Sequence, residues 1–191
     1  MKVIGITGGS GVGKTIVTEI LSEKGIYVID ADIVSKQMVH KGSEYLNDIQ
    51  KCFGKEILNE FEELDRKALA DIIYNNKTKK ALLDNITYKY IVPKVKEIIN
   101  QNSKQDVIVI DAALLIESEL YKDCDIVVAV VSDRENRIRR ICNRDKISLE
   151  IAEKRINMQQ LDEFYTNNAD VIIYNNGYVE DLKKQVENKI L

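Results

Sequence analysis

The chain has 191 residues and a formal net charge of −3, with 45% hydrophobic and 31% charged residues. This length suits one α/β domain with a sizeable core, and the acidic balance argues against a nucleic-acid-binding protein. No apolar run approaches the about 18 residues of a membrane span, and the N-terminus does not have the pattern of a signal peptide. We therefore expect a cytoplasmic protein with no membrane or nucleic-acid partner.

The cysteines and the single histidine exclude several classes of site. Cys52, Cys124 and Cys142 are widely spaced and form no C-x-x-C pair, which argues against a zinc site and a disulfide framework. We interpret them as reduced core residues. His40 has no candidate nucleophile near it in the sequence, so we interpret it as the end of a helix rather than a catalytic base.

The first predicted strand, KVIGIT, leads into the segment GGSGVGKT, residues 8–15. The segment fits G-x-x-x-x-G-K-[ST], and the apolar spacing after it predicts a helix that ends near Gly25. Glycines let successive backbone N–H groups point at phosphates, and the helix N-terminus adds partial positive charge. We predict that Lys14 contacts the β- and γ-phosphates of ATP and that the Thr15 hydroxyl ligates Mg²⁺. The predicted nucleotide-binding residues are Gly8, Gly9, Ser10, Gly11, Val12, Gly13, Lys14 and Thr15.

Five short apolar runs predict strands that are covered on both faces. Helical patterns lie between them, so the chain is expected to form a doubly wound α/β fold with a five-stranded parallel sheet. The predicted strands are Val3–Ile6, Ile26–Ile29, Val107–Ile110, Ile126–Val131 and Val171–Ile173.

The interval between the second and third strands contains helical patterns and no convincing strand. We predict a helical acceptor-binding domain at residues 33–104, inserted into a nucleotide-binding core of residues 1–32 and 105–191. An arginine-rich helical stretch at residues 133–160 is predicted to form a lid. The apolar helix faces of the insertion are Leu46, Ile49 and Phe53, then Leu69, Ile72 and Ile73, then Leu82, Leu83, Ile86, Tyr90 and Ile91.

Acidic residues follow the second and third predicted strands. Asp30 and Asp32 come directly after IYVI, and Asp111 ends VIVI. The carboxyl ends of parallel strands meet at the edge where α/β proteins bind ligands. One aspartate of the first pair is expected to cap the next helix, and we favour Asp32 as the group that orients an acceptor hydroxyl and accepts its proton. Asp111 is either a ligand of Mg²⁺, directly or through water, or a turn residue.

The segment DRENRIRRICNRDK, residues 133–146, places Arg137, Arg140 and Arg144 on one face of a predicted helix. Guanidinium groups can offset charge on a transferred phosphoryl group, although most helical arginines only form a solvated face. Arg155 and Gln159 fall at i, i+4 on the next predicted helix, where they either line the same cleft or pack at its rim.

Seven segments, in order, resemble the dephospho-coenzyme A kinase family: GITGGSGVGKT, VIDAD, DRKAL, VIVIDAALLIESELY, RIRRICNRD, EKRINMQQ and ADVIIYNNG. The joint pattern is far more specific than a phosphate loop alone. The resemblance implies that Mg·ATP phosphorylates the ribose 3′-hydroxyl of dephospho-CoA, with a nucleotide-binding core, a helical CoA domain and a lid. It also implies active-site roles for Thr7, Asp32 and Arg140, and maps the second lid arginine to Arg144.

Two departures from the family pattern are visible. Ala113 stands where the family usually has proline, and Tyr88 and Lys89 stand where it usually has His-Pro. The second departure bears on acceptor binding. The alternatives are a P-loop kinase for another small acceptor, such as a nucleoside or nucleoside monophosphate, a regulatory GTPase, and a non-catalytic ATP-binding module. The missing D-x-x-G and N-K-x-D motifs disfavour the GTPase. We expect a monomer or a weak homo-oligomer.

Overall fold

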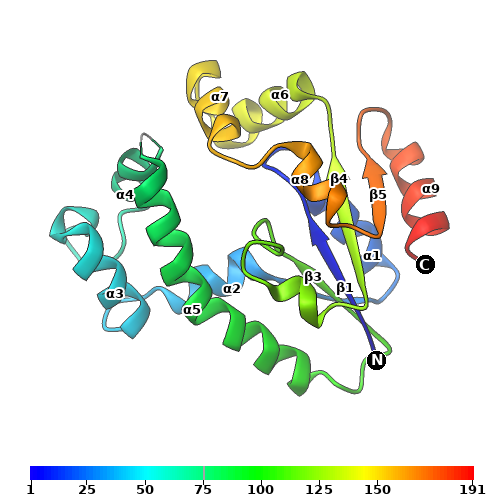
Figure 1. Ribbon diagram of the computed structural model, residues 1–191, viewed down its shortest axis with the longest axis horizontal. Coiled ribbons are helices and arrows are strands. Elements are labelled where there is room, and N and C mark those ends of the chain that lie inside the picture. The colour runs from blue at the N-terminus through cyan, green and yellow to red at the C-terminus, as the bar shows by residue number, and fades with distance from the viewer. Residues whose placement is uncertain (75) are drawn as a thin grey trace. The chain divides into compact units, whose positions relative to one another are not determined.

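The computed structural model describes residues 1–74 and 76–191. They divide into two compact units, Met1–Asp30 with Ile99–Leu191, and Ala31–Ile98. The described residues of the first unit form a five-stranded parallel sheet in the order β2-β3-β1-β4-β5 (Figure 1). This confirms the predicted α/β fold class and the all-parallel sheet. The strands are β1 (Lys2–Thr7), β2 (Tyr27–Asp30), β3 (Val107–Asp111), β4 (Ile126–Val131) and β5 (Val171–Tyr174).

Both faces of the sheet are covered, which explains why the strands are continuous apolar runs. In β4, Val130 packs in the core with residues of α1 and α9, while its neighbour Ala129 packs on the other face against Tyr165 of α8. The helices α6 and α7 pack on each other around Ile141 and Ile156. The helices of this unit are α1 (Lys14–Glu23), η2 (Leu120–Asp123), α6 (Arg134–Asp145), α7 (Leu149–Asn157), α8 (Asp162–Asn167) and α9 (Val179–Lys189).

The second unit is helical, and the strand-type pairing among its described residues is one isolated bridge, Leu58 to Leu64. Ser43 caps its second helix and Asp65 caps α4 by accepting two backbone N–H bonds. Both placements satisfy amide groups that a helix N-terminus leaves unpaired. Its buried core is Tyr45, Ile49, Phe53, Ile57 and Leu69. Its helices are α2 (Ala31–Met38), α3 (Glu44–Phe53), η1 (Lys55–Ile57), α4 (Arg66–Ile73) and α5 (Lys77–Gln101), the last of which ends in the first unit.

The interpretation of all three cysteines as core residues is wrong for Cys52, which is exposed on α3. Cys124 and Cys142 are half-buried, and all three are free thiols. Burial raises the pKa of the Cys124 thiol to about 12, so this group stays protonated and unreactive near neutral pH. Among the described residues, no helix has both the length and the apolar character needed to cross a membrane.

Candidate active site

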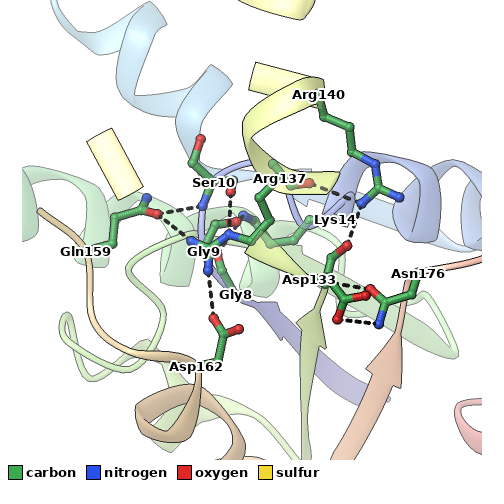
Figure 2. A network of polar contacts seen from close by, with 12 residues as sticks. Gly8, Gly9, Ser10, Lys14, Asp133, Arg137, Arg140, Gln159, Asp162 and Asn176 are labelled. Carbon is green, nitrogen blue, oxygen red and sulfur yellow. Dashed lines mark hydrogen bonds and ion pairs between the residues drawn. The ribbon is translucent and has the colours of Figure 1, made fainter. Parts of the chain in front are cut away.

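Residues 8–13 form a loop between the carboxyl end of β1 and the first turn of α1. Gly13 stands at the N-cap of α1 with a φ of +97°, and a Cβ there would lie 2.1 Å from Nδ2 of Asn175. Only glycine fits this position. Lys14 follows as the first residue of α1, and its Nζ donates to the Gly8 carbonyl at 2.9 Å (Figure 2). An ammonium group and a helix N-terminus therefore both bring positive charge to the loop.

Arg140 of α6 contacts the carbonyl side of this loop. Its Nη1 donates to the carbonyl oxygens of Gly11 and Val12 at 3.2 Å each and to Ser132 Oγ at 3.0 Å. Its Nη2 donates to the Asn175 carbonyl at 2.9 Å, and Asn175 Nδ2 donates in turn to Val12 O at 2.8 Å. Burial, with a smaller contribution from Arg139, lowers the pKa of Arg140. Arginine nevertheless remains charged at neutral pH.

These contacts orient the backbone amides of the loop. In a planar trans peptide, the carbonyl of one residue and the N–H of the next point in opposite directions. Because Gly11 O and Val12 O point to Arg140, the N–H groups of Val12 and Gly13 point away from it. Consecutive N–H groups turned to one side form an anion-binding concavity, the arrangement that phosphate groups require.

Polar side chains lie at the carboxyl ends of three neighbouring strands. Asp30 and Asp111 are register partners at the ends of β2 and β3, and Asp111 is also paired with Ile6 of β1. Thr7, the next residue of β1, is fully buried, and its hydroxyl has no hydrogen-bond partner within residues 1–74 and 76–191. Thr15 is exposed in the first turn of α1. The predicted positions of Thr7 and Asp111 at strand ends are thus observed.

The donor set at these strand ends fits Mg²⁺ bound together with a nucleotide. Across the described residues, no group of three His, Cys, Asp or Glu side chains forms a complete metal site. Mg²⁺ needs no such cluster, because one or two protein oxygens, waters and substrate phosphates commonly complete its shell. The exposed Thr15 hydroxyl and the half-buried Asp111 carboxylate are oxygen ligands of that type.

Arg144 pairs with its neighbour Asp145 near the end of α6. Its Nε donates to Asp145 Oδ1 at 2.7 Å, and the Arg144 side chain is 60% exposed. Arg155 of α7 pairs with the other carboxylate oxygen of Asp145. The Arg144 hydrogen bond, with the charges of both arginines, holds the pKa of Asp145 below its usual value. Asp145 therefore joins α6 to α7.

Asp32 lies in the first turn of α2, in the helical unit, and is exposed. It follows Asp30, the last residue of β2, by two positions. An exposed carboxylate in a first helical turn is available to a ligand hydroxyl and is favoured there by the helix dipole.

Sequence reasoning missed the contacts that Arg137 and Gln159 make with the loop. Arg137 donates to Ser10 O at 3.1 Å and to Asp162 Oδ1 at 2.8 Å (Figure 2). Gln159 accepts from Ser10 N at 2.8 Å. The expectation that Gln159 shares a helix with Arg155 is wrong, since α7 ends at Asn157. The i, i+3 spacing of Arg137 and Arg140 was the available signal, but it did not distinguish a loop contact from a solvated face.

In the helical unit, Lys89 pairs with Asp48 where the family usually has proline. Lys89 Nζ lies 2.7 Å from Asp48 Oδ2, and the Tyr90 hydroxyl donates to the same oxygen at 2.6 Å. The hydrogen bond from Lys89, and to a smaller extent the one from Tyr90, holds the pKa of the Asp48 carboxyl well below its usual range. The Tyr90 ring also stacks on Tyr45, with ring centroids 4.8 Å apart. Lys89, one of the two residues that depart from the family pattern, thus lies in a polar cluster between α3 and α5.

Comparison with known proteins shows the family to which the chain belongs. The family model described as dephospho-CoA kinase matches residues 2–181. The chain belongs to the dephospho-CoA kinase family. A dephospho-CoA kinase of Fusobacterium nucleatum subsp. nucleatum is 40% identical over 187 residues, which are 98% of this chain and 96% of that relative. A solved dephospho-CoA kinase from Campylobacter jejuni is 30% identical, with a TM-score of 0.69 over 100% of this chain and 96% of that one. The crystal structure of TT1252 from Thermus thermophilus shares the fold, with a TM-score of 0.76 at 23% identity over 100% of this chain and 98% of that chain.

Proposed function

We propose that the protein transfers the γ-phosphoryl group of ATP to the ribose 3′-hydroxyl of dephospho-CoA and releases coenzyme A and ADP. The observation that carries the proposal is a complete phosphate loop, with Lys14 at the N-terminus of α1, in a member of the dephospho-CoA kinase family. A bond forms between the 3′-oxygen and the γ-phosphorus. The bond from the γ-phosphorus to the bridging oxygen breaks, and its electron pair leaves with ADP.

The loop residues hold the phosphates of ATP. The N–H groups of residues 11–13 and the start of α1 donate to phosphate oxygens, and the Lys14 ammonium moves from the Gly8 carbonyl to the β- and γ-phosphates. Arg140 keeps the amides in that orientation through the carbonyls of Gly11 and Val12. Arg144 contacts the nucleotide from the exposed end of α6, in exchange for part of its pairing with Asp145.

Asp32 is the residue that receives the acceptor. Its carboxylate accepts a hydrogen bond from the ribose 3′-hydroxyl, orients the oxygen for in-line attack and takes its proton as the new bond forms. The exposure of Asp32 in the first turn of α2 supports this role. Thr7 stands directly before the loop, and its buried hydroxyl, which has no hydrogen-bond partner among the described residues, is a polar group available to the reacting phosphates.

Mg²⁺ would be held by Thr15 and Asp111, and when bound it would neutralise charge on the β- and γ-phosphates. The remaining assignments follow from the same family reaction. Residues 33–104 bind the CoA acceptor, residues 1–32 and 105–191 bind the nucleotide, and residues 133–160 close as a lid that excludes water. The protein acts in the cytoplasm as a monomer or weak homo-oligomer.

Acceptor-dependent release of ADP tests this proposal. The purified protein is mixed with Mg·ATP and, in parallel, with dephospho-CoA, adenosine, AMP, shikimate or no acceptor. We expect ADP release only with dephospho-CoA. Turnover with a different acceptor, or hydrolysis at the same rate in every arm, would contradict the proposed substrate and leave a P-loop enzyme of another specificity.

A further inference from the structure

Arg137 is a buried cation whose side chain hydrogen-bonds to the loop residue Ser10, to Gln159 and to Asp162. The residue is 5% exposed, although it is charged at neutral pH. Among the described residues, its ion pair joins Nη1 to Asp162 at 2.8 Å, and the Asp162 side chain is 40% exposed. Removing a guanidinium from water is unfavourable unless it is paired and hydrogen-bonded, and a buried ion pair alone is a poor source of stability. The position of this arginine therefore calls for another explanation.

The three nitrogens of Arg137 donate in three directions. Nε donates to the Ser10 carbonyl at 3.1 Å, Nη1 to Asp162, and Nη2 to Gln159 Oε1 at 3.1 Å (Figure 2). The same Gln159 oxygen accepts from the backbone N–H of Ser10 at 2.8 Å. A planar guanidinium can make this set of bonds, whereas a lysine ammonium cannot reproduce its geometry.

Ser10 is consequently held on both sides. Its N–H bond to Gln159 fixes the peptide plane between Gly9 and Ser10, and its C=O bond to Arg137 fixes the plane between Ser10 and Gly11. Because carbonyl and amide point in opposite directions across a trans peptide, the Gly11 N–H is turned away from Arg137. This extends by one residue the row of amides that Arg140 orients at Val12 and Gly13.

The glycine content of the loop supports this account independently. The motif G-x-x-x-x-G-K-[ST] requires glycine only at positions 8 and 13 here, yet Gly9 and Gly11 are also glycine. A Cβ on Gly9 would lie 2.4 Å from Arg137 Nη2, and a Cβ on Gly11 would lie 2.6 Å from the Arg137 carbonyl oxygen. At both additional glycines, a larger residue would therefore come too close to Arg137.

We propose that Arg137, supported by Gln159, is a positioning residue that fixes the two peptide planes at Ser10 and so presents the Gly11 N–H to the phosphates of a bound nucleotide. The proposal rests on the nucleotide-binding part of the proposed function and does not depend on which acceptor is used.

Nucleotide binding without acceptor tests the proposal separately from the proposed reaction. Calorimetry would give the dissociation constants of Mg·ATP and inorganic tripolyphosphate for the wild type, Arg137→Lys and Gln159→Met. Arg139→Lys is the matched control, because Arg139 is exposed on the same helix and donates to Asn136. Each variant is also unfolded in urea to measure its free energy of unfolding.

We expect Arg137→Lys and Gln159→Met each to raise both dissociation constants by about tenfold, the equivalent of one charge-assisted hydrogen bond. The control is expected to match the wild type. Unchanged dissociation constants, with or without a lower free energy of unfolding, would overturn the proposal and leave Arg137 as a structural ion pair.

If Arg137→Lys does not fold, Gln159→Met decides, because it keeps the arginine and removes the acceptor of the Ser10 N–H. If the wild type binds Mg·ATP but transfers no phosphoryl group to dephospho-CoA, the proposed function is contradicted, while the positioning proposal is not.

Discussion

Arg140 Nη1 donates to the backbone carbonyl of Val12 at 3.2 Å, so an arginine of α6 contacts the carbonyl side of the phosphate loop. The resemblance implied that Arg140 belongs to the active site, and charge neutralisation on the moving phosphoryl was the expected mechanism. In the observed contact, the guanidinium acts on the loop backbone. Electrostatic preorganisation of this kind sets donors before the substrate arrives and so needs no reorganisation during the reaction.

Replacing Arg140 by lysine is expected to lower kcat/KM for ATP by about 10²-fold, because one ammonium cannot hold Gly11 O, Val12 O and Asn175 O together. The measurement is a double-mutant cycle with Asn175→Ala in steady-state kinetics. Since Asn175 also donates to Val12 O, we expect the two losses to be non-additive by about 1 kcal/mol. Strictly additive losses would show that the two side chains do not act on the loop as one unit.

Lys14→Ala is expected to weaken nucleotide binding and to lower the turnover number by about 10²-fold or more, because it removes the ammonium at the loop. Steady-state kinetics with varied ATP separates the two effects. Lys24→Ala is a suitable control, since Lys24 pairs with Glu187 at the far end of α1. Kinetic constants for Lys14→Ala that equal those of the control would remove the loop from the phosphate-binding role.

Asp32→Asn is expected to lower turnover by about 10²-fold or more while leaving ATP affinity nearly unchanged, because the amide cannot accept the proton of the acceptor hydroxyl. Asp181→Asn is the matched control, since Asp181 also lies in the first turn of a helix. The measurement compares kcat and the dissociation constant of ATP between the two variants. A near-normal kcat for Asp32→Asn would exclude Asp32 as the base.

The pairing of Asp145 with Arg144 and Arg155 predicts a pH-dependent contribution to stability. The pKa of Asp145 is lowered in the folded protein, so its contribution is present above the unfolded pKa of about 4 and is lost as pH falls through the folded value. We expect Asp145→Asn to lower the free energy of unfolding at pH 7 by about 0.5–1 kcal/mol, because the pair is partly exposed.

Urea unfolding of the wild type and Asp145→Asn at pH 7, 5, 4 and 3 measures this contribution. The difference between the two proteins should shrink below pH 4. Asp106→Asn, at an exposed carboxylate between α5 and β3, serves as the control. A difference that stays constant down to pH 3 would contradict the linkage.

The sheet and the loop could be predicted because their signals are local. Strands covered on both faces leave uninterrupted apolar runs, and each boundary of the five predicted runs lies within one residue of the observed strand. The loop was identified by glycine spacing between a strand and a helix. Each of these patterns is contained in about ten consecutive residues.

What the sequence did not reveal depends on contacts between distant segments. Arg137 and Ser10 are 127 positions apart, and nothing in the charge pattern of α6 distinguishes a buried arginine from a solvated one. The helix α5 continues through Pro93, because packing outweighs the propensity of proline to interrupt a helix. Cys52 is exposed because it lies outside the apolar face of α3 that Leu46, Ile49 and Phe53 form, a local feature of helical spacing.

The most direct test of the central claim is the position of the new phosphate on the product. Dephospho-CoA is incubated with the protein and Mg·ATP, and the product is isolated and examined by phosphorus NMR and by digestion with a 3′-nucleotidase. The account predicts a ribose 3′-phosphate that the nucleotidase removes, with one ADP formed per product. A phosphate at another position, or ADP formed without any phosphorylated product, would contradict it.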